Sequence, residues 1–140
     1  MKEFQLSILA PDEDMYEGSC VSLVVPLSDG QYGILADHRN MTAGLIPGIL
    51  SYTRPDGKKK YLAVSYGFVK VEFNEVLVMV DDAERPEEID ENRAQQDADA
   101  AQEAMLQQKS LRDYRMAQAD LSKAKNRLRA RKHYDGNLLI

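Results

Sequence analysis

The sequence changes character near Ala83, and this change divides the chain into two unlike parts. Before Ala83, short apolar runs are separated by glycine and proline, residues that favour turns. After it, no glycine occurs until Gly136, and Pro86 is the only proline. Because helix interiors disfavour both residue types, a long stretch without them favours helices. We therefore predict a β domain over residues 1–84 and a helical domain over residues 85–140.

The first part has the period of two that is typical of half-buried strands. Apolar residues occupy every second position in two runs, Phe4, Leu6 and Ile8, then Val21, Leu23 and Val25. Pro55-Asp56-Gly57 predicts a hairpin turn, with strands near residues 50–54 and 60–64. A second pair of strands, residues 68–73 and 76–80, is expected around Asn74-Glu75. Several short strands at this spacing predict an all-β sandwich or barrel.

The second part has the period of a helix. Apolar residues three and four positions apart form two stripes: Ala94, Ala98, Ala101 and Met105, then Tyr114, Ala117, Leu121, Ala124 and Leu128. Ser110 and Asp113 are spaced as in a capping box, and Pro86 is expected near the first turn of the earlier helix. The two stripes predict an antiparallel helical hairpin that bends near Lys109. Because alanine buries little apolar area, we expect this hairpin to be weakly held and able to extend.

Charge is segregated along the chain although the net charge is only −5. Residues 84–103 carry two basic and eight acidic residues, whereas residues 104–140 carry nine basic and three acidic residues. Two antiparallel helices with these charges attract each other. Exposed ion pairs contribute only about 0–1 kcal/mol each, and salt weakens them.

Several classes of function have no signal in the sequence. Neither a phosphate-binding P-loop nor a nucleophile elbow occurs. Cys20 is the single cysteine, and His38 and His133 are far apart, so no metal-ligand spacing is present. The N-terminus lacks the apolar core of a signal peptide, and no run approaches the roughly 18 apolar residues of a membrane span. We expect a non-catalytic chain, without a metal, in a reducing compartment.

Four segments match the motifs of one family, in that family's order. They are Pro11–Tyr16, Gly33–His38, Ser65–Val71 and Ile89–Ala94. The chain resembles the epsilon subunit of bacterial F-type ATP synthase, whose motifs there are Pro-Asp-x-x-x-Tyr/Phe, Gly-Ile-Leu-Pro-x-His, Ser-Gly-Gly-Phe-x-x-Val and Ile/Leu-Asp-x-x-Arg-Ala. One departure is Ala36-Asp37, which replaces the usual Pro-Gly before the histidine.

This resemblance implies a ten-stranded β-sandwich followed by a two-helix hairpin. It implies a non-catalytic rotor subunit, in the central stalk of a proton- or sodium-translocating ATP synthase, without a cofactor of its own. The sandwich would contact the gamma subunit and the c-ring through Gln31, Tyr32 and His38. The expected location is peripheral, at the cytoplasmic face of the bacterial plasma membrane, with membrane contact only through the complex and no nucleic-acid partner.

The resemblance also implies that the helices regulate ATP hydrolysis. They would extend toward the alpha/beta catalytic subunits and inhibit them. The basic arm of the second helix would then meet an acidic surface on those subunits; its residues are Lys125, Arg129, Arg131 and Lys132.

A candidate regulatory ATP site comes from the same resemblance, because some bacterial members bind ATP in the helical domain. Arg93, Lys123 and Arg127 would neutralise phosphates, and Asp90 would orient the ribose or base. Lys123 stands where an arginine is often found, and lysine lacks the planar fork that binds phosphate in a bidentate manner. The alternative, which we favour, is a surface ion pair between Asp90 and Arg93.

Two other functions remain open from the sequence. One is a free-standing adaptor whose coiled hairpin enters the channel of a cytosolic enzyme, as transcript-cleavage factors do. Those factors need acidic residues at the hairpin tip to hold a metal ion, and residues 107–110 include none. The other is a small ATP sensor, which depends on the roles of Asp90 and Arg93.

Overall fold

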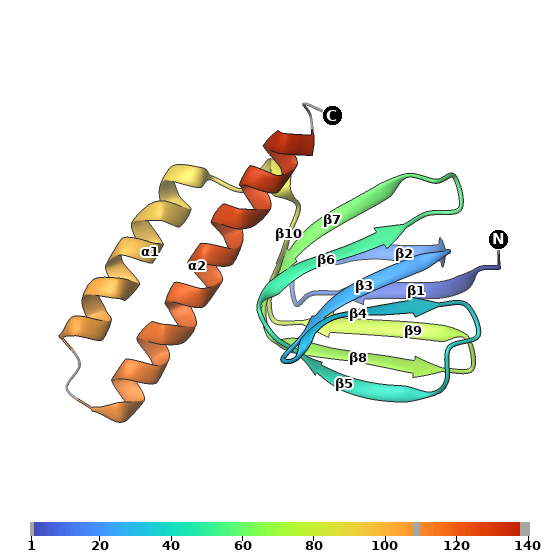
Figure 1. The fold of residues 1–140 in the computed structure, drawn as a ribbon, viewed down its shortest axis with the longest axis horizontal. Helices are drawn as coiled ribbons and strands as arrows, with labels where there is room; N and C mark the ends of the chain where they lie inside the picture. The colour runs from blue at the N-terminus through green and yellow to red at the C-terminus, as the bar shows by residue number, and fades with distance from the viewer. Residues whose placement is uncertain (1, 108–109, 138–140) are drawn as a thin grey trace. The chain divides into compact units, whose positions relative to one another are not determined.

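The computed structural model describes residues 2–107 and 110–137, and the chain divides into two compact units, Met1–Glu84 and Arg85–Ile140 (Figure 1). In the described residues, the first unit holds ten strands and the second holds one 3₁₀ turn and two α-helices. The expectation of a β-sandwich followed by a helical hairpin is confirmed. None of the helices in the described ranges combines the length and apolarity needed to span a membrane.

The ten strands form two five-stranded sheets. The first sheet has the order β2-β1-β9-β8-β5 and the second has the order β10-β7-β6-β3-β4. The strands are β1 Phe4–Leu9, β2 Asp14–Cys20, β3 Ser22–Leu27, β4 Gly30–Leu35, β5 Met41–Leu45, β6 Gly48–Thr53, β7 Lys59–Val64, β8 Gly67–Glu72, β9 Glu75–Val80 and β10 Ala83–Glu84. β1 pairs in parallel with β9, and the other strand pairs are antiparallel. The parallel pair therefore joins β1 and β9, which are the first and last strands of that sheet along the chain.

The core lies between the inner faces of the two sheets. Alternate residues of β1 point inward, so Phe4, Leu6 and Ile8 are buried as their spacing predicts. The largest fully buried side chains come from both sheets: Phe4, Leu6, Ile8, Leu23, Ile34 and Leu50. Such a core of branched and aromatic residues excludes a large apolar area from water and holds the sandwich together.

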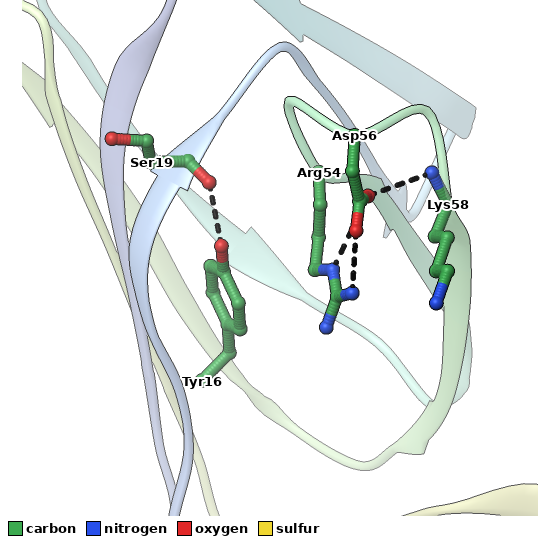
Figure 2. A network of polar contacts seen from close by, with 5 residues as sticks. All are labelled: Tyr16, Ser19, Arg54, Asp56 and Lys58. Carbon is green, nitrogen blue, oxygen red and sulfur yellow. Dashed lines mark hydrogen bonds and ion pairs between the residues drawn. The ribbon is translucent and has the colours of Figure 1, made fainter.

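The hairpin predicted at Pro55-Asp56-Gly57 is confirmed between β6 and β7. Gly57 has φ 85°, a left-handed conformation that glycine adopts without steric cost. The Asp56 carboxylate accepts hydrogen bonds from the Arg54 guanidinium at 2.7 Å and from the Lys58 backbone N–H at 3.0 Å (Figure 2). These bonds, that from Arg54 foremost, lower the pKa of Asp56 to about 2. On β2, in the other sheet, the Tyr16 hydroxyl donates to the Ser19 carbonyl (Figure 2).

The turn between β8 and β9 differs from the prediction by one residue. It consists of Phe73 and Asn74, with φ 49° and 63°, rather than Asn74 and Glu75. Glu72 and Glu75 face each other across it as the last pair of the ladder. Two central residues with positive φ are characteristic of the type I′ turn, whose twist matches that of the flanking strands. The strand pairing thus places Phe73, a residue that favours strands, in a turn.

The helical unit contains a 3₁₀ turn η1, Pro86–Glu88, and the helices α1, Glu91–Leu106, and α2, Leu111–Asn137. The buried positions of α1 are Ala94, Ala98 and Ala101, as its stripe predicts. Ser110 caps α2 as predicted, since its Oγ accepts from the Asp113 backbone N–H at 3.1 Å. The expected bend at Lys109 and the end of the tail, residues 138–140, lie outside the described residues.

The sequence predicts Pro86 near the first turn of α1, but Pro86 lies four residues before the N-cap of that helix. Asp90 and Ile89 both have extended backbone conformations, which separate α1 from the residues before it. Asp90 is the N-cap of α1, and Pro86 instead begins η1. Proline suits that position because its fixed φ is compatible with a helical turn and its missing N–H leaves no broken bond.

We predict that Gly67→Ala destabilises the sandwich by about 1–3 kcal/mol or more. A Cβ at this position would collide with the Met79 carbonyl oxygen and lie 2.7 Å from the Val80 Cα, both on β9. Neither backbone atom can move without disturbing the ladder between β8 and β9. Gly44→Ala in β5 is the matched control, because no atom lies within 4 Å of its added Cβ. Urea unfolding of both variants measures the difference, and equal stabilities would contradict the prediction.

A second prediction concerns acid stability. Because the pKa of Asp56 is lower in the folded chain than the usual value of about 3.9, its ionised form stabilises the fold above that pH. This contribution is lost as the pH falls toward 2. Asp56→Asn should therefore be less stable than the wild type at neutral pH, with the difference shrinking as the pH falls from about 4 and vanishing only below pH 2. Thermal unfolding across this range tests it, with Asp12→Asn at another exposed turn as the control.

Candidate functional site

The structure brings Tyr32 of β4 and His38 of the following loop together. The Tyr32 hydroxyl lies 2.8 Å from His38 Nε2, and the two rings meet edge to face at 5.6 Å. His38 Nδ1 lies 2.8 Å from the Arg39 carbonyl oxygen, which only accepts, so Nδ1 carries the proton that is donated. In that tautomer, Nε2 accepts from the Tyr32 hydroxyl. The imidazole is held at both nitrogens by its neighbours.

Gln31, the third residue expected at this interface, lies on the other face of β4. Tyr32 and Ile34 point toward the core, and Gln31, between Gly30 and Tyr32, is exposed. Successive residues of a strand point to opposite faces, so one flat surface of β4 cannot present both Gln31 and Tyr32. The site around His38 therefore includes Tyr32 and leaves Gln31 apart from it.

The loop after β4 forms a turn at Ala36-Asp37, where the family motif has Pro-Gly. Asp37, which replaces the glycine of the resemblance, has φ 62°. Aspartate is one of the few residues other than glycine that visit this left-handed region. The Asp37 backbone N–H donates to Asn74 Oδ1 at 2.7 Å, and its carboxylate pairs with Lys2 Nζ at 3.2 Å. Asp37 thus ties the loop to the N-terminal segment and to the turn between β8 and β9.

Asn74 and Asn40 complete this network, and sequence reasoning missed both. Asn74 Nδ2 donates to the Glu3 carbonyl at 3.0 Å, and Asn40 Oδ1 accepts from the Phe73 N–H at 3.0 Å. Three segments that are distant in sequence are therefore joined at one end of the sandwich. Asparagine in a turn was the available signal, because its amide can replace backbone partners.

In the helical unit, the candidate ATP residue Asp90 acts as a helix cap. Its Oδ1 accepts from the Arg93 backbone N–H at 3.1 Å, which satisfies a free donor at the start of α1. The contact between these residues is thus carboxylate to backbone. The Arg93 side chain is exposed.

Lys123 and Arg127, the other two candidate residues, line one groove between α1 and α2. The groove has a volume of about 400 Å³. Its lining residues are Asp97, Ala100, Ala101, Ala104, Asp120, Lys123, Ala124 and Arg127. The Arg127 guanidinium pairs with the Asp97 carboxylate at 3.2 Å. The structure therefore places Lys123 and Arg127 in one groove with two carboxylates, and Asp90 and Arg93 are not among its lining residues.

The basic arm divides into residues with contacts inside the helical unit and residues directed to solvent. Arg131 donates to the carbonyl oxygens of Pro86 at 3.4 Å and Glu87 at 3.2 Å, which connects α2 to η1. Arg129 is exposed and donates to Asn126 Oδ1 at 3.1 Å. Lys125 and Lys132 are also exposed. The exposed part of the arm therefore consists of Lys125, Arg129 and Lys132.

Cys20 is the one thiol of the chain, and it packs in the sandwich core. Its Sγ lies 3.0 Å from the Ser22 carbonyl oxygen and 3.2 Å from that of Thr53. Burial raises the pKa of the Cys20 thiol. Since the thiolate is the reactive form, this environment keeps the sulfur unreactive.

Family models match both units of the chain. Residues 3–86 match the β-sandwich domain of the ATP synthase delta/epsilon chain, and residues 87–132 match its long α-helix domain. The two matches together span nearly the whole chain, in the order that the fold shows.

Relatives match over nearly their whole length. The ATP synthase epsilon chain of Caldanaerobacter subterraneus subsp. tengcongensis is 36% identical over 133 residues, which cover 95% of this chain and 96% of the relative. That of Synechococcus sp. is 35% identical and covers 93% and 97%. That of Shouchella clausii is 34% identical and covers 95% and 98%.

Solved structures share the fold. A chain in the cryo-EM structure of the Euglena gracilis mitochondrial ATP synthase, OSCP/F1/c-ring, has a TM-score of 0.78 at 23% identity, covering 89% of this chain and 78% of its own length. One in the central stalk and c-ring of the Tetrahymena thermophila mitochondrial ATP synthase has a TM-score of 0.68 at 15% identity, covering 93% and 97%. With two family models and several relatives matched from end to end, this chain belongs to the epsilon-chain family of F-type ATP synthases.

Proposed function

We propose that this chain is a non-catalytic subunit of the central stalk, which joins the gamma subunit to the c-ring and restrains ATP hydrolysis by the alpha/beta subunits. Membership of the epsilon-chain family over both units supports this role. The complex, rather than this chain, performs the chemistry. The chain is peripheral to the membrane through the complex, on the cytoplasmic face of the bacterial plasma membrane.

The observation that carries the regulatory part is the way in which the helical unit is held. The buried positions of α1 are alanines, and Arg127 and Arg131 add polar contacts within the unit. Alanine buries little apolar area, so separating α1 from α2 costs less free energy than opening the sandwich. A helical unit held in this way can change its conformation while the sandwich stays folded.

The charges on α2 suggest what an extended helix would meet. Lys125, Arg129 and Lys132 are exposed in the folded hairpin. Extension would also release Arg127 from Asp97 and Arg131 from the carbonyls of η1, which adds two cations to the surface. We propose that these residues contact an acidic surface on the catalytic subunits. Such contacts weaken as ionic strength rises.

The groove that contains Lys123 and Arg127 does not favour ATP as a ligand. Lys123 and Arg127 share their groove with Asp97 and Asp120, and the negative charges of these carboxylates repel phosphate groups. Asp90 already serves as the cap of α1. We infer that Asp90 serves as a helix cap and Arg93 as a surface residue, without a bound nucleotide.

Truncation after Glu84 tests the regulatory role. Because β10 ends at Glu84 and pairs with β7, the shortened chain should keep a folded sandwich with native-like circular dichroism. A synthase assembled with it should hydrolyse ATP faster than one with the full chain.

A charge variant tests how much of this restraint comes from the basic arm. Replacing Lys125, Arg129 and Lys132 by glutamine should leave the hairpin folded but removes the three exposed cations of the basic arm, so hydrolysis should rise part of the way. An ATPase rate that is unchanged by the truncation would show that the helices do not restrain this enzyme.

A further inference from the structure

The His38 loop, residues 36–40, begins with a turn that its own residues favour only weakly. Ala36 and Asp37 are the central residues of this turn. Asp37 has φ 62°, and Ala36 is not one of the non-glycine residues with positive φ in the part of the chain that the structure describes. A positive φ at the second central residue alone is what a type II turn requires, and proline followed by glycine is its favoured pair. Ala36 and Asp37 supply neither the fixed φ of proline nor the freedom of glycine.

The turn between β8 and β9 holds both ends of this loop. At the start of the loop, Asn74 Oδ1 accepts from the Asp37 N–H at 2.7 Å. At its end, Asn40 Oδ1 accepts from the Phe73 N–H at 3.0 Å. Figure 1 shows the turn after β8 and the loop after β4 at the end of the sandwich where β1 begins. These two hydrogen bonds, the clamp, fix the loop on either side of His38.

The Asn74 amide is itself held in one orientation. Its Nδ2 donates to the Glu3 carbonyl at 3.0 Å, and its backbone carbonyl accepts from the Gln5 N–H at 3.2 Å. Since an N–H only donates and a carbonyl only accepts, the partners determine which end of the amide faces Asp37. The ladder between β8 and β9 continues up to this turn. The sandwich thus determines the position of the group that holds the loop.

The other contact at the start of the loop is weaker. Lys2 Nζ pairs with the Asp37 carboxylate at 3.2 Å, but these side chains are 83% and 60% exposed. Ion pairs with this exposure contribute little, because water and salt screen them. Asn74 is therefore the side chain that holds Asp37 in place.

The clamp affects His38 only through the backbone of the loop. The His38 ring contacts the Tyr32 hydroxyl and the Arg39 carbonyl oxygen, both at 2.8 Å, and neither contact involves Asn74. These two partners select the tautomer that has its proton on Nδ1. A loop released at Asp37 would let the ring leave Tyr32 and adopt both tautomers. The tautomer of His38 therefore reports the path of the loop.

We propose that Asn74 is the positioning residue of the His38 loop, and that the clamp replaces the turn-forming pair that the loop lacks. The surface around Tyr32 and His38 then owes its shape to a turn that is distant in sequence. The effect of the clamp on assembly rests on the central-stalk function proposed above. The clamp itself does not depend on that function.

The first experiment measures the NMR chemical shifts of the His38 ring nitrogens in full-length chains. Asn74→Gly removes the amide but keeps a residue that suits a type I′ turn, so the sandwich should stay folded while the ring changes from one tautomer to a mixture. A triple variant adds Ala36→Pro and Asp37→Gly to this change. Because proline and glycine favour a type II turn, its ring should return to the wild-type tautomer. Lys2→Ala is the control and should match the wild type.

Two results of this experiment would overturn the proposal. Wild-type ring shifts in Asn74→Gly would mean that the loop keeps its path without the clamp. A triple variant that remains a mixture would mean that a turn-forming pair cannot take the place of the amide.

The second experiment titrates the same chains into synthase that lacks this subunit. Asn74→Gly should bind about tenfold more weakly than the wild type if its loop has the competent shape about a tenth of the time. The triple variant should bind within about twofold of the wild type, because its loop is restored. Wild-type affinity in Asn74→Gly, together with altered His38 shifts, would overturn the role of the clamp in assembly. Failure of the wild-type chain to bind would instead refute the central-stalk function.

Discussion

The alanine contact of the helical hairpin is the interaction on which the proposed regulation depends. Ala94, Ala98 and Ala101 are the buried residues of α1, and Ala117 and Ala124 are buried on α2. Small side chains let two helices approach closely, but each removes little apolar surface from water. The sandwich core consists instead mainly of leucine, isoleucine, valine and phenylalanine. One chain therefore combines a firmly packed unit with a weakly packed one.

The polar contacts of the hairpin can be exchanged for contacts with a partner. Arg127 pairs with a half-exposed Asp97, and ion pairs of this kind contribute about 0–1 kcal/mol. Arg131 binds carbonyl oxygens of η1, which water can satisfy equally well once the helices separate. Neither contact therefore contributes much free energy to holding α2 against α1 and η1. The contacts at the His38 end are different, because there hydrogen bonds join three segments of the sandwich to one another.

Much of the fold could be predicted from the sequence, since alternation and helical spacing depend on which residues are buried. The exceptions depend on tertiary contacts. Pairing of β8 with β9 forces Phe73 into a turn against its preference, and an extended Ile89 separates Pro86 from α1. At the candidate site, the separation of Gln31 from Tyr32 follows from strand geometry alone and was available from the sequence. The partners of Asn40 and Asn74 were not, because they come from distant segments.

Native-state hydrogen exchange on the full-length chain tests most directly whether the two units differ in stability. Backbone amides in the middle of α1 and α2 should exchange at least about tenfold faster, after correction for sequence, than those of β1, β8 and β9. Higher salt should increase the exchange of the helices, because it screens the Arg127–Asp97 pair. Equal protection of helices and strands would contradict the account, because it would mean that the hairpin opens only when the whole chain unfolds.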